Sequence, residues 1–108
     1  MFFGPQSKYR NQKTEVDGYT FDSKLEAARY VELKYLESEG IIADLTLQPK
    51  YHCTVNGKKV CTYVADFEYT TTADLKLHTE DVKGYKTDVY KLKKKLVEAL
   101  YNLTIEEV

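Results

Sequence analysis

The stretch from Val60 to Gly84 constrains the fold most, because its pattern predicts two β-strands joined by a short polar turn. Alternate residues from Val60 to Tyr69 are apolar, which is the period of a strand with one buried face. The expected buried residues are Cys61, Tyr63, Ala65, Phe67 and Tyr69. Leu75 to Lys83 predicts the second strand, in which Leu75, Leu77, Thr79, Asp81 and Lys83 share a face.

The register of this hairpin brings acidic residues together. A turn of two or four residues centred between Ala73 and Asp74 places Asp66 opposite Asp81 and Val64 opposite Lys83, whereas a three-residue turn places Glu80 opposite Asp66. Opposed side chains lie about 5 Å apart at Cβ, and like charges there are destabilising. The acids therefore need a positive partner, which is either Lys83 or a divalent metal.

Length and composition predict a single domain with one modest core. No apolar run approaches the roughly 18 residues of a membrane span, and Met1–Phe3 is too short for a signal peptide, so we expect a cytoplasmic protein. A two-residue Asn56–Gly57 turn would put Cys53 and Cys61 on opposite faces, whereas a three-residue loop would oppose them. A disulfide is not expected in a cytosolic protein.

Positive charge is concentrated in two places, although the formal net charge is only −1. One cluster lies near the N-terminus, and the other follows the hairpin. This asymmetry fits one phosphate-facing surface, and a solvated helix face is the alternative. The clustered residues are Lys8, Arg10 and Lys13, then Lys83, Lys86, Lys91, Lys93, Lys94 and Lys95.

The N-terminal half begins with residues 1–13, which have no period and predict a mobile arm. Short strands at 14–16 and 19–21 flank Asp17–Gly18, a strong hairpin signal. Asp22–Ser23 then predicts the start of a helix that runs to about Glu39 and ends at Gly40. The residues expected to form its apolar stripe are Leu25, Ala28, Val31, Leu33, Tyr35 and Leu36.

The C-terminal half predicts a three-stranded antiparallel meander made of 41–55, 60–69 and 75–83, with Pro49 at a strand start or an edge. A second helix from Thr87 or Asp88 to about Tyr101 follows, and then a short strand parallel to the third meander strand. The fold class is therefore α/β (α+β). The expected core face of the second helix is Val89, Leu92, Leu96, Val97, Ala99 and Leu100.

Charged residues on the two helices have alternative roles. Ser23 and Glu26 have the spacing of a capping box, in which the Glu26 side chain bonds back to the Ser23 amide. Glu26 also lies on the rim of the apolar stripe, from which a carboxylate could reach a metal. Glu32 and Lys93 each interrupt an apolar face, and we expect them to pair with each other.

This order of elements, with an acidic strand centre and an Asp-x-Lys at a strand end, resembles the PD-(D/E)XK nuclease superfamily. It resembles in particular small phage and prophage proteins described as endonuclease-I-like or Holliday-junction-resolvase-like. The resemblance covers about Tyr9 to Ile105. It departs from the superfamily pattern at Ala65, where proline is usual, and at Asp81, where glutamate is more frequent. The matching strings are EVDGYTFDSKLEAARYVELKYLE, LQPKY, YVADF, EDVKGYKTDVYKLKKKL and NLTI.

The resemblance implies a restriction-endonuclease-like core and a site for Mg²⁺, or Mn²⁺. Asp66 would bind the metal, Asp81 would be the second acid and Lys83 the lysine. Glu26 would be the first-helix glutamate, with Glu32 as the reserve candidate, and Gln48 would line the site. DNA-binding residues would be Lys86, Lys91 and Lys94 beside the site, with Lys13 and Arg10 from the N-terminal cluster.

The function that follows is a metal-dependent endonuclease acting on branched or structured DNA as a homodimer in the host cytoplasm of a phage. One alternative is a phage accessory protein that binds DNA without cutting it. The other is a nickase or single-strand nuclease on the same fold. From the residues alone, Asp66 could be an ordinary solvent-facing strand residue, and Asp81 with Lys83 could be an edge-strand charge pattern.

Overall fold

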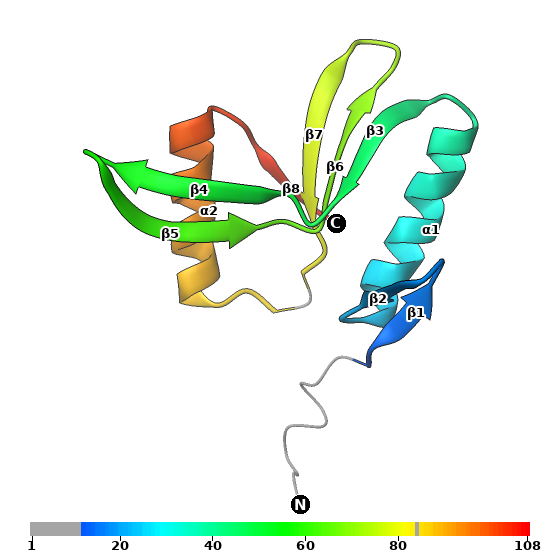
Figure 1. The fold of residues 1–108 in the computed structure, drawn as a ribbon, viewed down its shortest axis with the longest axis horizontal. Coiled ribbons are helices and arrows are strands. Elements are labelled where there is room, and N and C mark those ends of the chain that lie inside the picture. Colours follow the sequence, from blue (N-terminus) through cyan, green and yellow to red (C-terminus); the bar gives the residue numbers. More distant parts are fainter. Residues whose placement is uncertain (1–11, 84) are drawn as a thin grey trace, which may run out of the picture.

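The computed structural model describes residues 12–83 and 85–108, so most of the predicted N-terminal arm lies outside the described residues. β1 (Thr14–Val16) and β2 (Tyr19–Phe21) form the predicted hairpin (Figure 1). Its turn is Asp17–Gly18, and both residues have positive φ. Glycine adopts that conformation without steric cost, which explains the sequence signal.

Both helices begin and end where capping residues predict. Ser23 Oγ accepts the Glu26 N–H (3.1 Å) at the start of α1 (Lys24–Ser38), which ends before Gly40. Thr87 Oγ1 accepts the Tyr90 N–H (3.0 Å) at the start of α2 (Asp88–Tyr101). Neither of these helices of the described chain is long and apolar enough to cross a membrane.

A four-stranded sheet, which we call the core sheet, has the order β3-β6-β7-β8. Its first three strands are antiparallel, and β8 is parallel to β7, so the predicted direction of the last strand is confirmed. Two further strands form a separate ribbon, the arm, which extends away from the core sheet in Figure 1. The core sheet comprises β3 (Ile42–Leu47), β6 (Phe67–Thr71), β7 (Lys76–Asp81) and β8 (Ile105–Glu107); the arm comprises β4 (Lys50–Val55) and β5 (Lys58–Val64).

The prediction of single strands at 41–55 and 60–69 is wrong, because both segments bend at the same level. Gln48 N–H donates to Asp66 O (2.9 Å) and Ala65 N–H donates to Pro49 O (3.1 Å), so backbone pairing continues through the bend. Pro49 immediately precedes β4, as its missing N–H led us to expect. The sequence period does not reveal the bend, since the alternation of buried residues continues across it.

The bend divides the buried apolar residues into two clusters, so the prediction of one core is wrong. Side chains before the bend, such as Tyr63 and Ala65, belong to the cluster under the arm, whereas Phe67 and Tyr69 belong to the cluster under the core sheet. The core-sheet cluster contains Phe21, Ala27, Tyr30, Leu33, Ile42, Phe67 and Tyr69. The arm cluster contains Tyr51, Cys53, Tyr63, Ala65, Tyr90, Val97 and Ile105.

The arm has one local irregularity that changes the cysteine geometry. Asn56–Gly57 forms the predicted two-residue turn, but a β-bulge between Cys53 and Thr54 shifts the register and pairs Cys53 with Cys61. The prediction that a two-residue turn separates the cysteines onto opposite faces is therefore wrong. Both are free thiols.

The predicted apolar stripe of α1 is wrong at most positions. Among its large members only Leu33 is fully buried, whereas Leu25, Val31 and Tyr35 are exposed. The buried face instead carries Glu26, Ala27, Tyr30 and Leu33, which pack toward β3 and the N-terminal hairpin. Polar contacts orient the helix in this way: Tyr30 Oη donates to Asp17 (3.0 Å), and Arg29 reaches Glu80 on β7.

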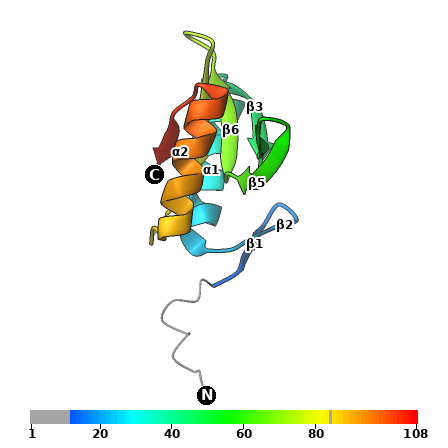
Figure 2. The same ribbon diagram turned by 90° about the vertical axis from the view of Figure 1, so that its left-hand side faces the viewer.

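The predicted core face of α2 is also partly wrong. Tyr90 and Val97 are its buried residues, and the helix packs on the arm with Val89 and Leu92 exposed. The predicted Glu32–Lys93 pair does not form, because α1 and α2 lie on opposite sides of the core sheet (Figure 1) and Glu32 pairs with Arg29 on its own helix (3.1 Å). The turned view has α2 in front and α1 behind (Figure 2).

A buried ion pair fastens α1 to the core sheet. Arg29 donates to both oxygens of Glu80, at 2.8 and 2.6 Å, and Tyr69 Oη also donates to that carboxylate. The Glu80 side chain is 1% exposed and that of Arg29 is 26% exposed. A buried charge without its partner is costly, so Glu80 depends on this bidentate contact.

Arg29→Met, which keeps the aliphatic stem and removes the charge, should lower the free energy of unfolding by roughly 3 kcal/mol because Glu80 is left buried without its cation. Urea denaturation measures this loss. The matched control is Glu32→Gln, which removes the exposed partner of the same arginine and should change stability by less than about 1 kcal/mol. Equal losses in the two variants would contradict the role given to Glu80.

Candidate metal centre at the bend

Of the two registers left open for the acidic hairpin, the core sheet has the one that a four-residue turn gives. The β6–β7 ladder runs from Phe67↔Glu80 to Thr71↔Lys76 around a four-residue turn, and one further step places Asp66 beside Asp81. The predicted pairing of Val64 with Lys83 is wrong, because β5 has left the sheet and Val64 pairs with Lys50.

Asp66 occupies the bend itself, between the two hydrophobic clusters. Its Oδ2 accepts the Val82 N–H at 2.6 Å, and its own N–H donates to Glu80 O at 3.0 Å. These bonds hold the start of β6 against the end of β7. Asp66 is therefore fixed by its neighbours, unlike an ordinary polar residue on a solvent-facing strand.

Asp81 is 1% exposed at the end of β7. Tyr63 Oη, from the arm, donates to its Oδ2. The ammonium of Lys83 lies 3.3 Å from Oδ1, yet that buried oxygen accepts no hydrogen bond. Buried carboxylate oxygens normally accept a hydrogen bond, whereas this one has the ion pair with Lys83 as its contact.

Glu26 joins the two aspartates from the first turn of α1. It is 6% exposed and lines a cavity of about 240 Å³ together with Asp66 and Gln48, which is where Gln48 was expected. The Glu32 side chain is 65% exposed and is bonded to Arg29. The structure thus brings Glu26 to this site and leaves Glu32 outside it.

Burial and the nearby acids raise the pKa values of Asp66 and Glu26. Burial, then Asp81 and Glu26, raise the pKa of Asp66 to about 8, against the opposing bond from Val82 N–H. Burial raises the pKa of Glu26 as well, and Asp22 and Asp81 add to the rise, while Lys83 and a hydrogen bond with Asp66 oppose it. Without a cation, the cluster holds a proton near neutral pH.

The donor set fits a hard divalent cation such as Mg²⁺ or Mn²⁺, because all of its ligating atoms are carboxylate oxygens. Among residues 12–83 and 85–108, no three His, Cys, Asp or Glu side chains already surround a common point. Mg²⁺ does not require this, since one or two carboxylates with waters and phosphate oxygens are usual. Asp66 and Asp81 supply that pair, with Glu26 beside them.

The predicted DNA-binding lysines are only partly brought together. Lys86, Lys91 and Lys94 line one hollow near the C-terminus of β8, together with Lys95. Lys86 and Lys94 lie 3.2 and 3.3 Å from Glu107, whose pKa falls to about 2 because Tyr90 and both lysines bond to it.

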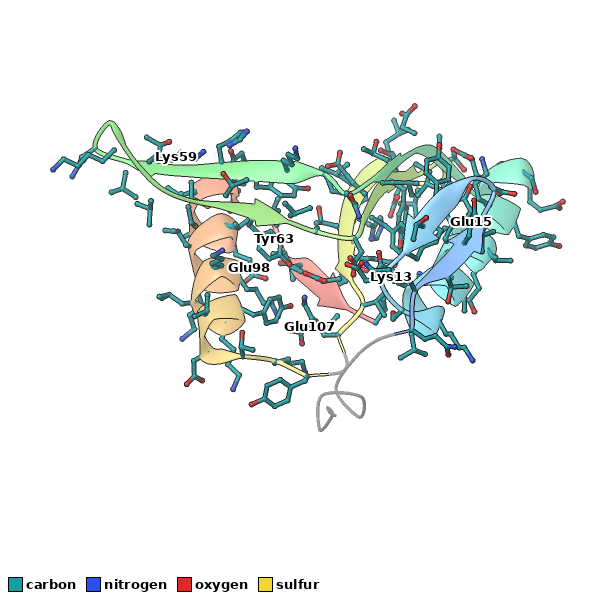
Figure 3. The ribbon with its side chains drawn as sticks, turned by 60° about the horizontal axis from the view of Figure 1, so that its bottom comes forward. Lys13, Glu15, Lys59, Tyr63, Glu98 and Glu107 are labelled. Carbon is teal, nitrogen blue, oxygen red and sulfur yellow. The ribbon has the colours of Figure 1, made fainter. Side chains whose placement is uncertain are left out.

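The N-terminal basic residues do not join this hollow. Lys13 pairs with Asp22 (3.0 Å), and Figure 3 places it in the part of the molecule that carries the N-terminal hairpin. Arg10 lies outside the described residues.

Sequence reasoning missed two tyrosines at the site. The Tyr63 hydroxyl bonds to Asp81, which raises the pKa of Tyr63 further than burial alone and keeps the hydroxyl a donor. The Tyr90 ring lies 4.6 Å from the Lys83 ammonium. The sequence did contain a signal for Tyr63: the alternation predicts that it is buried, and a buried tyrosine hydroxyl needs a hydrogen-bond partner.

The alanine at position 65 contributes a backbone hydrogen bond to the bend. Ala65 is fully buried, and its N–H donates to Pro49 O (3.1 Å) across the bend. Proline at this position would remove that donor. The bend in this chain therefore includes a cross-strand hydrogen bond that proline at position 65 could not make.

A family model described as a protein of unknown function (DUF1064) matches residues 6–106. The chain belongs to the DUF1064 family. No curated protein and no solved structure matches it. The DUF1064 match spans nearly the whole chain, including every acid of the candidate metal centre, and its description assigns no activity.

The acid cluster should make the metal-free protein less stable as pH rises. A carboxyl whose folded pKa is raised contributes stability that is present below its ordinary pKa of 3.8 and is lost as pH approaches about 8. Asp66→Asn removes the charge, so its melting temperature relative to wild type should rise across this range when both are measured with a chelator.

Asp74→Asn is the control, because the Thr71 hydroxyl and the Lys76 amide lower the pKa of Asp74. It should show no such gain toward pH 8. A pH-independent difference between Asp66→Asn and wild type would contradict the charge competition described above.

Proposed function

We propose that this protein is a metal-dependent endonuclease that hydrolyses phosphodiester bonds in DNA, with a PD-(D/E)XK-type site on a restriction-endonuclease-like core. The observation that carries the proposal is the convergence of Glu26, Asp66, Asp81 and Lys83 from three elements, with a buried oxygen of Asp81 left without a hydrogen bond. The resemblance of the sequence strings to small phage resolvase-like proteins adds the substrate class.

Asp66 and Asp81 would hold the metal, and Glu26 would complete its oxygen environment. When bound, Mg²⁺ makes a bound water more acidic and offsets charge that develops on the scissile phosphate. The Lys83 ammonium lies 3.3 Å from Asp81, and in a complex with DNA it would also face the scissile phosphate. Its ammonium would donate to a phosphate oxygen or orient the attacking water. The bend keeps these groups partly out of solvent, which strengthens each electrostatic contact.

DNA would extend from the metal centre across the lysines that follow it. Lys86, Lys91 and Lys94 lie within eleven positions of Lys83 and share one hollow. Such lysines contact phosphates without reading sequence. Branched or structured DNA is the substrate that the resemblance implies, and a phage protein acting in the host cytoplasm is the corresponding setting.

A homodimer is part of the proposal, and α2 offers a surface for it. Val89, Leu92, Leu96 and Ala99 follow a heptad spacing on one side of this helix; Val89 and Leu92 are 63% and 69% exposed, whereas Leu96 packs against the arm cluster. In a parallel pair of α2 helices, Asp88 of one chain would flank Lys93 of the other. A second copy of the chain would thus cover the exposed part of the stripe and place opposite charges beside each other.

Leu92→Glu should convert the dimer into a monomer, because it places a charge at the centre of the apolar stripe. Light scattering coupled to size-exclusion chromatography gives the mass. Leu75→Glu is the control, since Leu75 is also an exposed leucine (80%), lies in the β6–β7 turn and should leave the dimer intact. A monomeric wild-type protein would refute the dimer.

The test of activity is cleavage of a labelled four-way junction, a linear duplex and a single strand, each with Mg²⁺, Mn²⁺ or a chelator. We expect metal-dependent cutting of the junction. Asp81→Asn should lower the rate by more than about 100-fold, since loss of a mere outer-shell partner of a metal already costs about 10- to 100-fold. Glu26→Gln should also lose activity, whereas Glu32→Gln should retain it.

Other outcomes identify other functions. Cutting that survives in Asp81→Asn would place the chemistry elsewhere. Binding of the junction without cutting under any condition would favour a DNA-binding accessory protein. Cutting confined to the single strand, or to one strand of the duplex, would indicate a nuclease of different specificity on the same site.

A further inference from the structure

Tyr63 connects the arm to the candidate metal centre. It lies on β5 with 4% of its surface exposed, and its side chain points from the arm toward the core sheet (Figure 3). Its hydroxyl donates to Oδ2 of Asp81 on β7. This side-chain bond therefore joins β5 of the arm to β7 of the core sheet at the site.

The bond gives the two carboxylate oxygens of Asp81 different contacts. Oδ2 is engaged by Tyr63, while Oδ1 lies 3.3 Å from the Lys83 ammonium and accepts no hydrogen bond. A carboxylate held by one oxygen has a fixed rotation about its Cβ–Cγ bond. The remaining oxygen is then offered in a single direction.

A second tyrosine acts on the lysine. The Lys83 ammonium lies 4.6 Å from the centre of the Tyr90 ring, within the range of a cation–π contact. The rings of Tyr63 and Tyr90 are 6.3 Å apart, and Tyr90 Oη donates to Glu107 (2.8 Å). The two tyrosines therefore form one packed unit against the acid and the lysine.

We propose that Tyr63 is a positioning residue that directs Oδ1 of Asp81 toward a bound divalent cation by occupying Oδ2. This inference rests on the proposed function, because it requires Asp81 to bind a metal. Hydrogen bonds from outside the ligand set commonly orient metal ligands in this way, and their loss typically costs about 10- to 100-fold in metal affinity.

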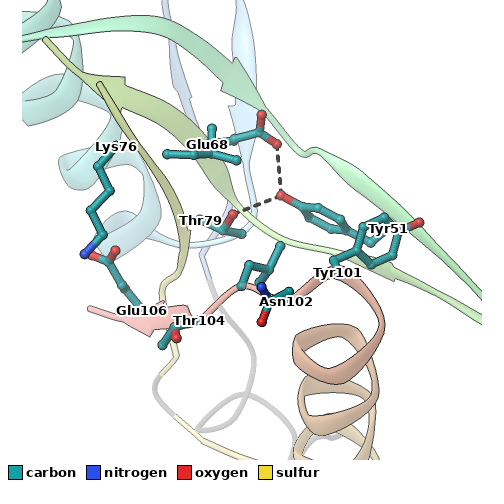
Figure 4. Close-up of a pocket in the computed structure, with 10 residues that line it drawn as sticks. Tyr51, Glu68, Lys76, Thr79, Tyr101, Asn102, Thr104 and Glu106 are labelled. Atoms are coloured by element: carbon teal, nitrogen blue, oxygen red, sulfur yellow. Dashed lines mark hydrogen bonds between the residues drawn. The ribbon is translucent and has the colours of Figure 1, made fainter. Parts of the chain in front are cut away.

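Tyr51 provides a matched control within the same arm. It is paired with Tyr63 across the β4–β5 ladder and is 7% exposed. Its hydroxyl bonds to Glu68 (2.9 Å) and Thr79 (3.0 Å) in a separate pocket (Figure 4). Tyr51→Phe thus removes another buried tyrosine hydroxyl that joins the arm to the core sheet, and this hydroxyl does not contact the acids of the site.

The experiment is calorimetric titration of Mn²⁺ into wild type, Tyr63→Phe and Tyr51→Phe without DNA. Tyr63→Phe should bind Mn²⁺ about 10- to 100-fold more weakly, and Tyr51→Phe should keep the wild-type affinity. In cleavage assays Tyr63→Phe should lower kcat while KM for DNA stays unchanged, since Tyr63 acts on the metal ligand and not on the phosphate-binding lysines.

A measurement on the wild-type protein removes dependence on how Tyr63→Phe folds. Mg²⁺ should perturb the near-ultraviolet tyrosine spectrum, because a cation on Oδ1 weakens Oδ2 as an acceptor for Tyr63. Tyr51→Phe should give the same perturbation. Metal binding without this spectral change, or equal affinities in Tyr63→Phe and wild type, would overturn the inference alone. Absence of any metal binding by wild type would overturn both the inference and the proposed function.

Discussion

The bend at Ala65–Asp66 is the constraint on which the rest of the structure depends. Two cross-strand hydrogen bonds carry the backbone pairing through it, from Gln48 to Asp66 and from Ala65 to Pro49. Before the bend the strand belongs to the arm as β5, and after the bend it belongs to the core sheet as β6. Each half buries its own apolar cluster, so Asp66 lies at the boundary between two cores.

Placing an acid at that boundary has an electrostatic consequence. Asp66, Asp81 and Glu26 are partly or wholly removed from water within reach of one another, and the pKa of Asp66 rises to about 8. Like charges in such a setting persist only with a proton or a cation between them. A fold selected only for stability would have little reason to gather these acids, whereas a metal centre requires them.

Stability is secured elsewhere, by polar contacts that the strand and helix periods do not reveal. The Arg29–Glu80 pair fixes α1 on the core sheet and turns its less apolar face inward. The hydroxyl of Tyr90 likewise bonds to Glu107 on β8 and ties α2 to the edge of the core sheet. Both apolar stripes predicted from helical periodicity are therefore largely exposed, because buried ion pairs and tyrosine hydroxyls outweigh a simple count of apolar residues.

The sequence by itself determined the elements and the local chemistry. Capping residues set both helices, Asp17–Gly18 and Asn56–Gly57 set two turns, and period-two alternation indicated the β6–β7 hairpin, whose register depended on the length of its turn. These signals are local, so they survive without knowledge of the rest of the chain.

Only the tertiary structure decided the bend, the two cores, the inward face of each helix and the contact of Tyr63 with Asp81. Each of these depends on which distant groups meet. Side-chain period is the same in a straight and in a bent strand, and it carries no record of a partner many residues away.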